Sequence, residues 1–161
     1  MKYCEKCGTL LIQKENGNDG LVPYCPHCKE YRFPMFNSAI STVIFNPDKD
    51  KILLIQQYNR KENILIAGYI NKGENAKEAL IREIKEEVGL NVKEYYYNDN
   101  EYFEKTNTLI HNYIVVAEDE NYILNEEVDH AQWFKKEEIL EVIKPCSLAK
   151  HFLKLALDKM K

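Results

Sequence analysis

The sequence predicts an α/β protein, more closely an α+β sandwich in which a mixed β-sheet lies between helices, preceded by a small N-terminal module. Runs of β-branched residues occur with helical segments, but without regular βαβ alternation. Four of the five cysteines lie within the first 28 residues. A chain of 161 residues with 45% hydrophobic and 30% charged side chains can bury one ordinary core, so global disorder is excluded.

The N-terminal module is expected to fold around a metal ion. Cys4, Cys7, Cys25 and Cys28 form two C-x2-C pairs, a spacing typical of tetrahedral Zn²⁺ sites. Two disulfides are the alternative, and they would need an oxidising compartment that nothing in the sequence indicates. So short a segment buries little apolar surface, so zinc would supply most of its stability. We therefore expect a zinc ribbon over residues 1–35 and a larger domain over residues 36–161.

The larger domain begins with a predicted hairpin. The β-branched run 38–45 ends at the turn signal Asn46-Pro47-Asp48, and residues 51–57 form its partner strand. A short strand over 64–67 is expected to stop at Gly68, and a helix follows over 76–88. Further strands are predicted over 92–103, 109–117 and 128–134, then a helix over 135–143 and a last helix capped by Ser147.

The helix over 76–88 has one apolar face and one acidic face. Leu80, Ile84 and Val88 recur at helical spacing and are expected to face the core. Glu83, Glu86 and Glu87 share a different face, where like charges repel each other by a few tenths of a kcal/mol per pair. A hard cation such as Mg²⁺, which binds carboxylate oxygens and phosphates, would offset that repulsion. A solvated acidic face is the alternative.

The segment 68–90 resembles the Nudix box, G-x5-E-x7-R-E-U-x-E-E-x-G-U, in which U is aliphatic. All nine defined positions match: Gly68, Glu74, Arg82, Glu83, Ile84, Glu86, Glu87, Gly89 and Leu90. On this pattern the chain is identified as a member of the Nudix superfamily. A four-cysteine ribbon ahead of such a domain is similar to the NADH pyrophosphatase branch. That branch carries a Ser-Gln-Pro-Trp-Pro-Phe-Pro segment, which is absent here: no proline lies between Pro47 and Pro145.

The resemblance implies a Nudix fold and a reaction. The expected activity is metal-dependent hydrolysis of the pyrophosphate bond in a nucleoside diphosphate linked to another moiety, with NAD(H), ADP-ribose or a related dinucleotide foremost. NMP would be released. Glu83 and Glu87 would hold Mg²⁺ or Mn²⁺, and Glu86 would be a further ligand or the general base. Arg82 would orient the glutamates, with Glu74 as its partner or a group near the metal. Gly68, Gly73 and Gly89 would shape the loop and the helix end.

Family members often recruit another carboxylate from outside the box. Glu127 is the candidate, Glu126 is the second choice, and an ordinary surface glutamate is the alternative. The tyrosine-rich strand 95–103 is a candidate for stacking a base, although cross-strand packing explains it equally well.

Two other functions stay open: a catalytically silent nucleotide-sensing module, and a pyrophosphohydrolase of RNA 5′ caps that uses the zinc ribbon. A formal net charge of -4 disfavours a nucleic-acid duplex as partner, although capped RNA is not excluded. No apolar run approaches the ~18 residues of a membrane helix, and the start lacks a signal-peptide pattern. We expect a cytoplasmic protein without a membrane partner, with a small-molecule nucleotide as substrate and a homodimer as one possible state.

Overall fold

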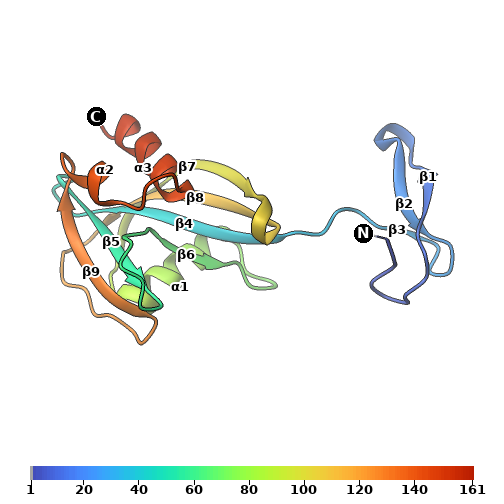
Figure 1. Ribbon diagram of the computed structural model, residues 1–161, viewed down its shortest axis with the longest axis horizontal. Coiled ribbons are helices and arrows are strands. Elements are labelled where there is room, and N and C mark those ends of the chain that lie inside the picture. The colour runs from blue at the N-terminus through green and yellow to red at the C-terminus, as the bar shows by residue number, and fades with distance from the viewer. Residues whose placement is uncertain (1) are drawn as a thin grey trace. The chain divides into compact units, whose positions relative to one another are not determined.

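The computed structural model describes residues 2–161, so Met1 of the expected ribbon lies outside the described residues. The chain divides into two compact units, one ending at Phe36 and the other comprising Asn37–Lys161 (Figure 1). The smaller unit is a three-stranded antiparallel sheet of β1 (Ile12–Glu15), β2 (Leu21–Cys25) and β3 (Glu30–Tyr31), with a short 3₁₀ turn at Gly17–Asp19.

The larger unit is built on a six-stranded mixed sheet in the order β7-β8-β4-β5-β9, with β6 also paired to β4. Only β4 and β8 run parallel among these described pairs. The strands are β4 (Asn37–Phe45), β5 (Lys51–Gln57), β6 (Ile66–Tyr69), β7 (Val92–Phe103), β8 (Thr108–Ala117) and β9 (Val128–Lys135). The helices are α1 (Ala76–Val88), α2 (Ile139–Val142) and α3 (Leu148–Lys159), and a 3₁₀ turn spans Glu104–Thr106.

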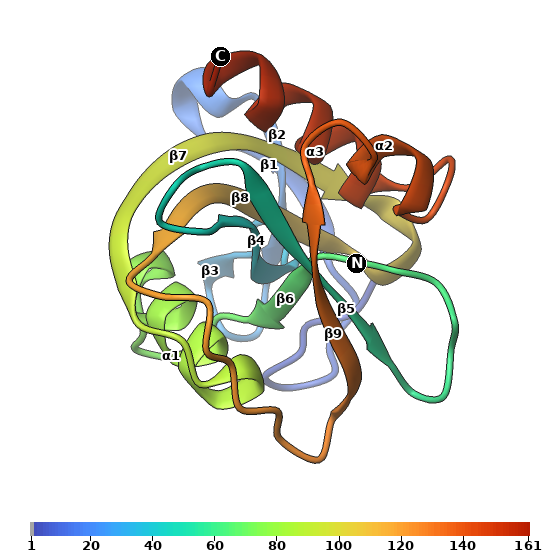
Figure 2. The same ribbon diagram turned by 90° about the vertical axis from the view of Figure 1, so that its left-hand side faces the viewer.

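Helices cover both faces of this sheet, which confirms the predicted sandwich (Figure 2). Successive residues of β4 alternate between the two cores: Ile40 and Ile44 pack with α1, whereas Val43 and Phe45 pack with α2 and α3. The buried residues of α1 include Leu80, Ile84 and Val88, the stripe that the sequence predicts. The sheet thus holds α1 in a fixed position on one face.

Local capping chemistry sets the ends of α1. Asn75 caps its start, accepting from the Glu78 backbone N–H, while the Glu78 side chain accepts from the Asn75 N–H. Gly89 ends the helix in the left-handed conformation, with φ of 68°. Ser147 caps α3 as expected, and its hydroxyl accepts from the Lys150 N–H.

Two predicted elements are wrong in detail. Gly68 does not end the strand predicted over 64–67. It pairs with Ile40 inside β6, which continues to Tyr69. The helix expected over 135–143 is confined to α2, since β9 continues through Lys135 and a turn follows before the short helix. Among residues 2–161, no helix combines the length and apolar character that crossing a membrane requires.

Candidate functional site

The four cysteines of the smaller unit converge on one point. Their Sγ atoms all lie within 4.8 Å of one another. The Cys7 Sγ is 3.5 Å from that of Cys25 and 3.4 Å from that of Cys28, and Cys4 lies 4.0 Å from Cys28. A disulfide needs about 2.05 Å, whereas thiolates ~2.3 Å from a tetrahedral zinc ion lie about 3.8 Å apart. The arrangement therefore fits a four-coordinate zinc ion and not two disulfides.

An arginine supports this cysteine cluster. The side chain of Arg32 is 9% exposed, and its Nε lies 3.4 Å from the Cys4 Sγ. The same guanidinium forms ion pairs with Glu5 at 3.0 Å and with Glu30 at 2.9 Å. Positive charge beside Cys4 favours the thiolate, and the contact with Arg32 is one of the factors that lower the pKa of Cys4.

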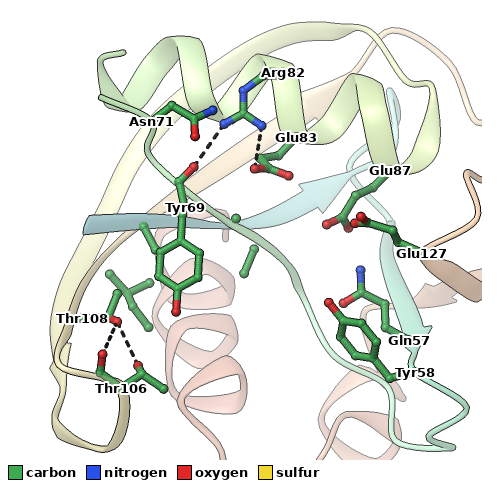
Figure 3. Close-up of a pocket in the computed structure, with 14 residues that line it drawn as sticks. Gln57, Tyr58, Tyr69, Asn71, Arg82, Glu83, Glu87, Thr106, Thr108 and Glu127 are labelled. Atoms are coloured by element: carbon green, nitrogen blue, oxygen red, sulfur yellow. Dashed lines mark hydrogen bonds and ion pairs between the residues drawn. The ribbon is translucent and has the colours of Figure 1, made fainter. Parts of the chain in front are cut away.

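Three acidic residues of the larger unit, Glu83, Glu87 and Glu127, border a pocket of about 420 Å³. Arg82, Glu83 and Glu87 reach it from α1, Gly68 and Tyr69 from β6, and Figure 3 shows Glu127 facing Glu87. Glu127 directly precedes β9. It is brought there by a loop whose Asn125 N–H donates to the carbonyl of Glu87 at 3.2 Å.

Arg82 gathers three carboxylates. Its Nε lies 2.7 Å from Glu74 Oε1, and its Nη1 lies 2.7 Å from Glu83 Oε1 and 3.1 Å from Glu86 Oε2. The hydrogen bond from Arg82 lowers the pKa of Glu74 to about 2. Arg82 also donates to the carbonyl of Tyr69 at 3.1 Å, which ties α1 to β6. The same guanidinium therefore orients Glu83 and the loop that leads into the helix.

Glu87 is in a different environment from its neighbours. It is only 3% exposed, and its Oε2 has no hydrogen-bond partner among residues 2–161. Burial raises its pKa to about 7, with the charges of Glu83 and Glu127 acting in the same direction and Gln57 opposing them. A buried carboxylate beside two others is costly unless a cation lies against it. The donor set, all hard oxygens, fits Mg²⁺ or Mn²⁺.

Gly68 makes room for Glu83. A Cβ at this position would lie 2.0 Å from the Cδ atom of Glu83, so a larger residue would displace the carboxylate. Gly73 lies in the loop before α1 and adopts a φ of 90°, which favours glycine. Gly68 is thus the one glycine of the 68–90 segment that adjoins the pocket.

Glu86 and Glu126 lie apart from this pocket. Glu86 pairs with Arg82, and its side chain is 56% exposed. Glu126 is exposed and does not line the pocket, whereas Glu127 does. The tyrosines of β7 do not line it either: Tyr95 and Tyr97 pack edge-on against Tyr113 of β8, with ring centroids 6.4 and 5.7 Å apart.

Several pocket residues were not found from the sequence. Tyr69 and Thr108 lie at the end of the pocket away from Glu87, and Gln57 and Tyr58 lie beside Glu127 (Figure 3). Gln57 reaches the pocket because β5 pairs with β9, where its partner is Val128. Tyr69 occupies an undefined position of the 68–90 segment, and no motif marks Gln57, Tyr58 or Thr108.

The chain is similar to a known protein family and to several curated proteins. The NUDIX domain family model matches residues 35–154. A protein named NAD-capped RNA hydrolase NudC from Pseudomonas aeruginosa is 22% identical over 98% of this chain and 56% of its own length. One with the same name from Shigella flexneri is 24% identical over 94% of this chain and 58% of its own. The chain therefore spans just over half the length of these curated relatives.

Solved structures share the fold. A NUDIX hydrolase from Nitrosomonas europaea has a TM-score of 0.65 at 19% identity, covering 96% of this chain and 89% of that one. The NUDIX domain of Shewanella oneidensis NrtR, solved in complex with ADP ribose, has a TM-score of 0.67 at 16% identity, covering 86% and 94%. Since the family model spans most of the chain and includes the whole 68–90 segment, the chain belongs to the Nudix family.

Proposed function

We propose that the chain is a divalent-metal-dependent pyrophosphohydrolase. Its substrate would be a nucleoside diphosphate linked to another moiety, with NAD(H), ADP-ribose and related dinucleotides foremost, and NMP would be a product. The observation that carries this proposal is the buried carboxylate of Glu87, which lies one helical turn from Glu83 and faces Glu127 at a pocket open to solvent.

Glu83, Glu87 and Glu127 would hold Mg²⁺ or Mn²⁺. Support comes from the unpartnered Oε2 of Glu87 and from its raised pKa, because a cation would offset both the burial and the mutual repulsion of these groups. When bound, such a cation would neutralise phosphoryl oxygens and lower the pKa of a bound water.

The remaining groups would position the substrate and the metal-binding carboxylates. Arg82 would hold Glu83 in place through their 2.7 Å ion pair. Glu86 would act as a ligand or as the general base, and for either role it must leave Arg82. Tyr69, at the far end of the pocket, offers an aromatic ring to a base or to the linked moiety.

The comparisons support a dinucleotide of the NAD type. Two of the relatives are named NAD-capped RNA hydrolases, and the NrtR domain of similar fold was solved with ADP ribose. The pyrophosphate bridge is common to NAD and ADP-ribose, so the proposal rests on that group and not on the nicotinamide.

The test is a substrate panel of NAD, NADH and ADP-ribose with Mg²⁺ or Mn²⁺, in which products are separated by chromatography. We expect AMP from at least one of them, and we expect Glu87→Gln to remove most of the turnover. Glu118→Gln, which changes an exposed carboxylate away from the pocket, is the matched control and should turn over normally. Wild-type turnover by Glu87→Gln would contradict the mechanism.

A second pair of variants tests the carboxylate outside the box. Glu127 lines the pocket, whereas its neighbour Glu126 does not. We expect Glu127→Gln to weaken activation by Mg²⁺ and Glu126→Gln to leave it unchanged. The reverse result would assign the role to Glu126. Binding of ADP-ribose without turnover under any metal condition would replace the proposed hydrolase with a nucleotide-sensing module.

A further inference from the structure

Asn125 lies in the loop that joins β8 to β9 and bonds to two of the proposed metal ligands. Its backbone N–H donates to the carbonyl of Glu87 at 3.2 Å, and its side-chain Oδ1 accepts from the backbone N–H of Glu127 at 3.0 Å. We propose that Asn125 is a positioning residue, which sets where the carboxylate of Glu127 lies relative to that of Glu87. The inference rests on the proposed function, because it concerns how the same metal-binding carboxylates are held.

Glu127 needs such a support because it belongs to no helix or strand. It is an exposed residue in a turn directly before β9, whereas Glu83 and Glu87 are fixed by α1. Side chains on a loop are held less precisely than side chains on a helix. A cation such as Mg²⁺ tolerates little variation, since its ligand oxygens lie at about 2.0–2.1 Å. The bonds of the residues just before Glu127 therefore decide whether its carboxylate is in place.

The loop is bound to the C-terminal end of α1 (Figure 2). The last carbonyls of a helix have no partner within the helix itself. Here the Ile123 N–H donates to the carbonyl of Val88 at 2.9 Å, and the Asn125 N–H donates to that of Glu87. Gly89 allows this close approach, since a Cβ at its position would lie 3.2 Å from the Cβ of Ile123. The backbone of the loop is thus fixed to α1 as far as Asn125.

The side chain of Asn125 extends this attachment to Glu127. Tyr122 and Leu124 pack against the core that α1 shares, and the Tyr122 hydroxyl donates to a carbonyl of β9 at 2.7 Å, so the loop before Asn125 is held. The bond from the Glu127 N–H to Oδ1 of Asn125 then closes a turn and fixes the backbone from which the carboxylate projects. Figure 3 shows that carboxylate facing Glu87, whose Oε2 has no hydrogen-bond partner among residues 2–161.

The alternative is a turn bond that stabilises the loop and has no effect on the site. The same loop contains such a bond for comparison, because Oδ1 of Asp119 accepts from the Asn121 N–H at 2.7 Å. Both bonds join a side-chain oxygen to the N–H two residues further on, but neither Asp119 nor Asn121 lines the pocket. Asp119→Ala is therefore the matched control for Asn125→Ala.

The test is a double-variant cycle on the binding of Mn²⁺ alone to the full chain, in which free Mn²⁺ is measured by electron paramagnetic resonance. We expect Asn125→Ala to weaken Mn²⁺ binding by about 10-fold or more, as loss of a group that orients a metal ligand does. Asn125→Asp keeps the accepting oxygen and should bind Mn²⁺ at least as tightly as wild type, and Asp119→Ala should bind it as wild type does. In a Glu127→Gln chain, Asn125→Ala should cause no further loss, because it acts through Glu127.

An equal loss of Mn²⁺ affinity from Asn125→Ala with and without Glu127→Gln would overturn the inference, since the bond would then support only the fold. Wild-type affinity of Asn125→Ala would overturn it too, as would a wild-type chain that binds no Mn²⁺. Turnover of NAD and ADP-ribose separates this inference from the proposed function. If wild type hydrolyses neither compound but the Mn²⁺ cycle gives the expected result, the role of Asn125 stands and the proposed function fails.

Discussion

Each of the two units gathers candidate metal ligands around an arginine, but the two arrangements differ. In the smaller unit, four sulfur atoms lie within 4.8 Å of one another, and Arg32 donates to one of them. In the larger unit, Arg82 draws Glu83 toward itself, while Glu87 and Glu127 face an open pocket. Four thiolates close the coordination shell of zinc and leave no place for water, whereas a carboxylate site of this kind leaves positions for water and substrate.

The difference also concerns what holds each unit together. Among residues 2–36, only Cys4, Val22 and Cys25 are buried apolar residues, so we expect the fold of this unit to depend on a bound metal ion. The larger unit has two apolar cores, one on each face of its sheet. Its carboxylates can therefore repel one another without unfolding it, because the free energy of folding comes from elsewhere.

Removal of zinc should have the largest effect. We expect about one zinc per chain, and Cys25→Ser should lose it together with the fold of residues 2–36, because structural zinc contributes roughly 10–16 kcal/mol in small domains. Elemental analysis and limited proteolysis measure this, with cleavage confined to the smaller unit. Cys146→Ser, which changes an exposed cysteine outside the cluster, is the control. A zinc-free chain whose smaller unit resists protease would show that the fold of this unit does not depend on zinc.

Glu87→Gln should change how stability depends on pH. The folded-state pKa of Glu87 is about 7, above its unfolded value, so the folded protein binds this proton more tightly. Wild-type stability should therefore fall as the pH rises from about 4.5 through 7, by up to about 3 kcal/mol. Glu87→Gln should lack this fall. Urea unfolding of both proteins at about pH 5 and 8, without added Mg²⁺ or Mn²⁺, measures this difference. If the stability of wild type and of Glu87→Gln changes equally with pH, burial does not raise the pKa of Glu87.

Arg32→Gln should weaken zinc binding while the unit still folds at saturating zinc. Loss of a group that supports a metal ligand costs about 10–100-fold in metal affinity. Competition with a chromogenic chelator measures the affinity, and Lys29→Gln, an exposed lysine beside Cys28, is the control. If the two variants bind zinc with equal affinity, the contact between Arg32 and Cys4 does not contribute to zinc binding.

The smallest expected effect concerns the cap of α1. Asn75→Ala removes the side chain that accepts from the Glu78 N–H and should lower the free energy of unfolding by about 1 kcal/mol. Turnover at a temperature well below the unfolding transition should not change, because the sheet and not the cap holds Glu83 and Glu87 in place. Thermal unfolding and kcat are measured together, and a large loss of kcat would mean that the carboxylates depend on this cap.

Much of the fold followed from local patterns. The bounds of α1 depend on residues inside or next to the helix, Asn75 and Gly89, so the sequence predicted them closely. A β-branched run and the turn signal after it likewise placed β4 and β5, and β7 has the bounds that the sequence predicts. The predicted helix over 135–143 was too long, because its helical pattern could not reveal that β5 pairs with β9 as far as Lys135.

Of the candidate site, the sequence predicted only the residues that lie close to one another along the chain. The spacing of Glu83, Glu86 and Glu87 puts them on one helix face, but it treats the three alike. Contacts between side chains separate them: Glu86 pairs with Arg82 and is exposed, whereas buried Glu87 shares its pocket with Gln57 of β5 and with Glu127, which precedes β9. Arg32 has no motif either, since its contact with Cys4 joins opposite ends of the smaller unit.

The parallel pairing of β4 with β8 has a consequence for how the chain acquires its structure during synthesis. Asn37 pairs with Thr108 and Phe45 with Val116, so the central strand cannot find this neighbour until the chain between them has been made. The four clustered cysteines all lie within the first 28 residues. With a metal ion bound to these cysteines, the smaller unit would fold while the rest of the chain is still being translated. The larger unit must wait for β8, and until then the apolar strand β4 lacks this neighbour.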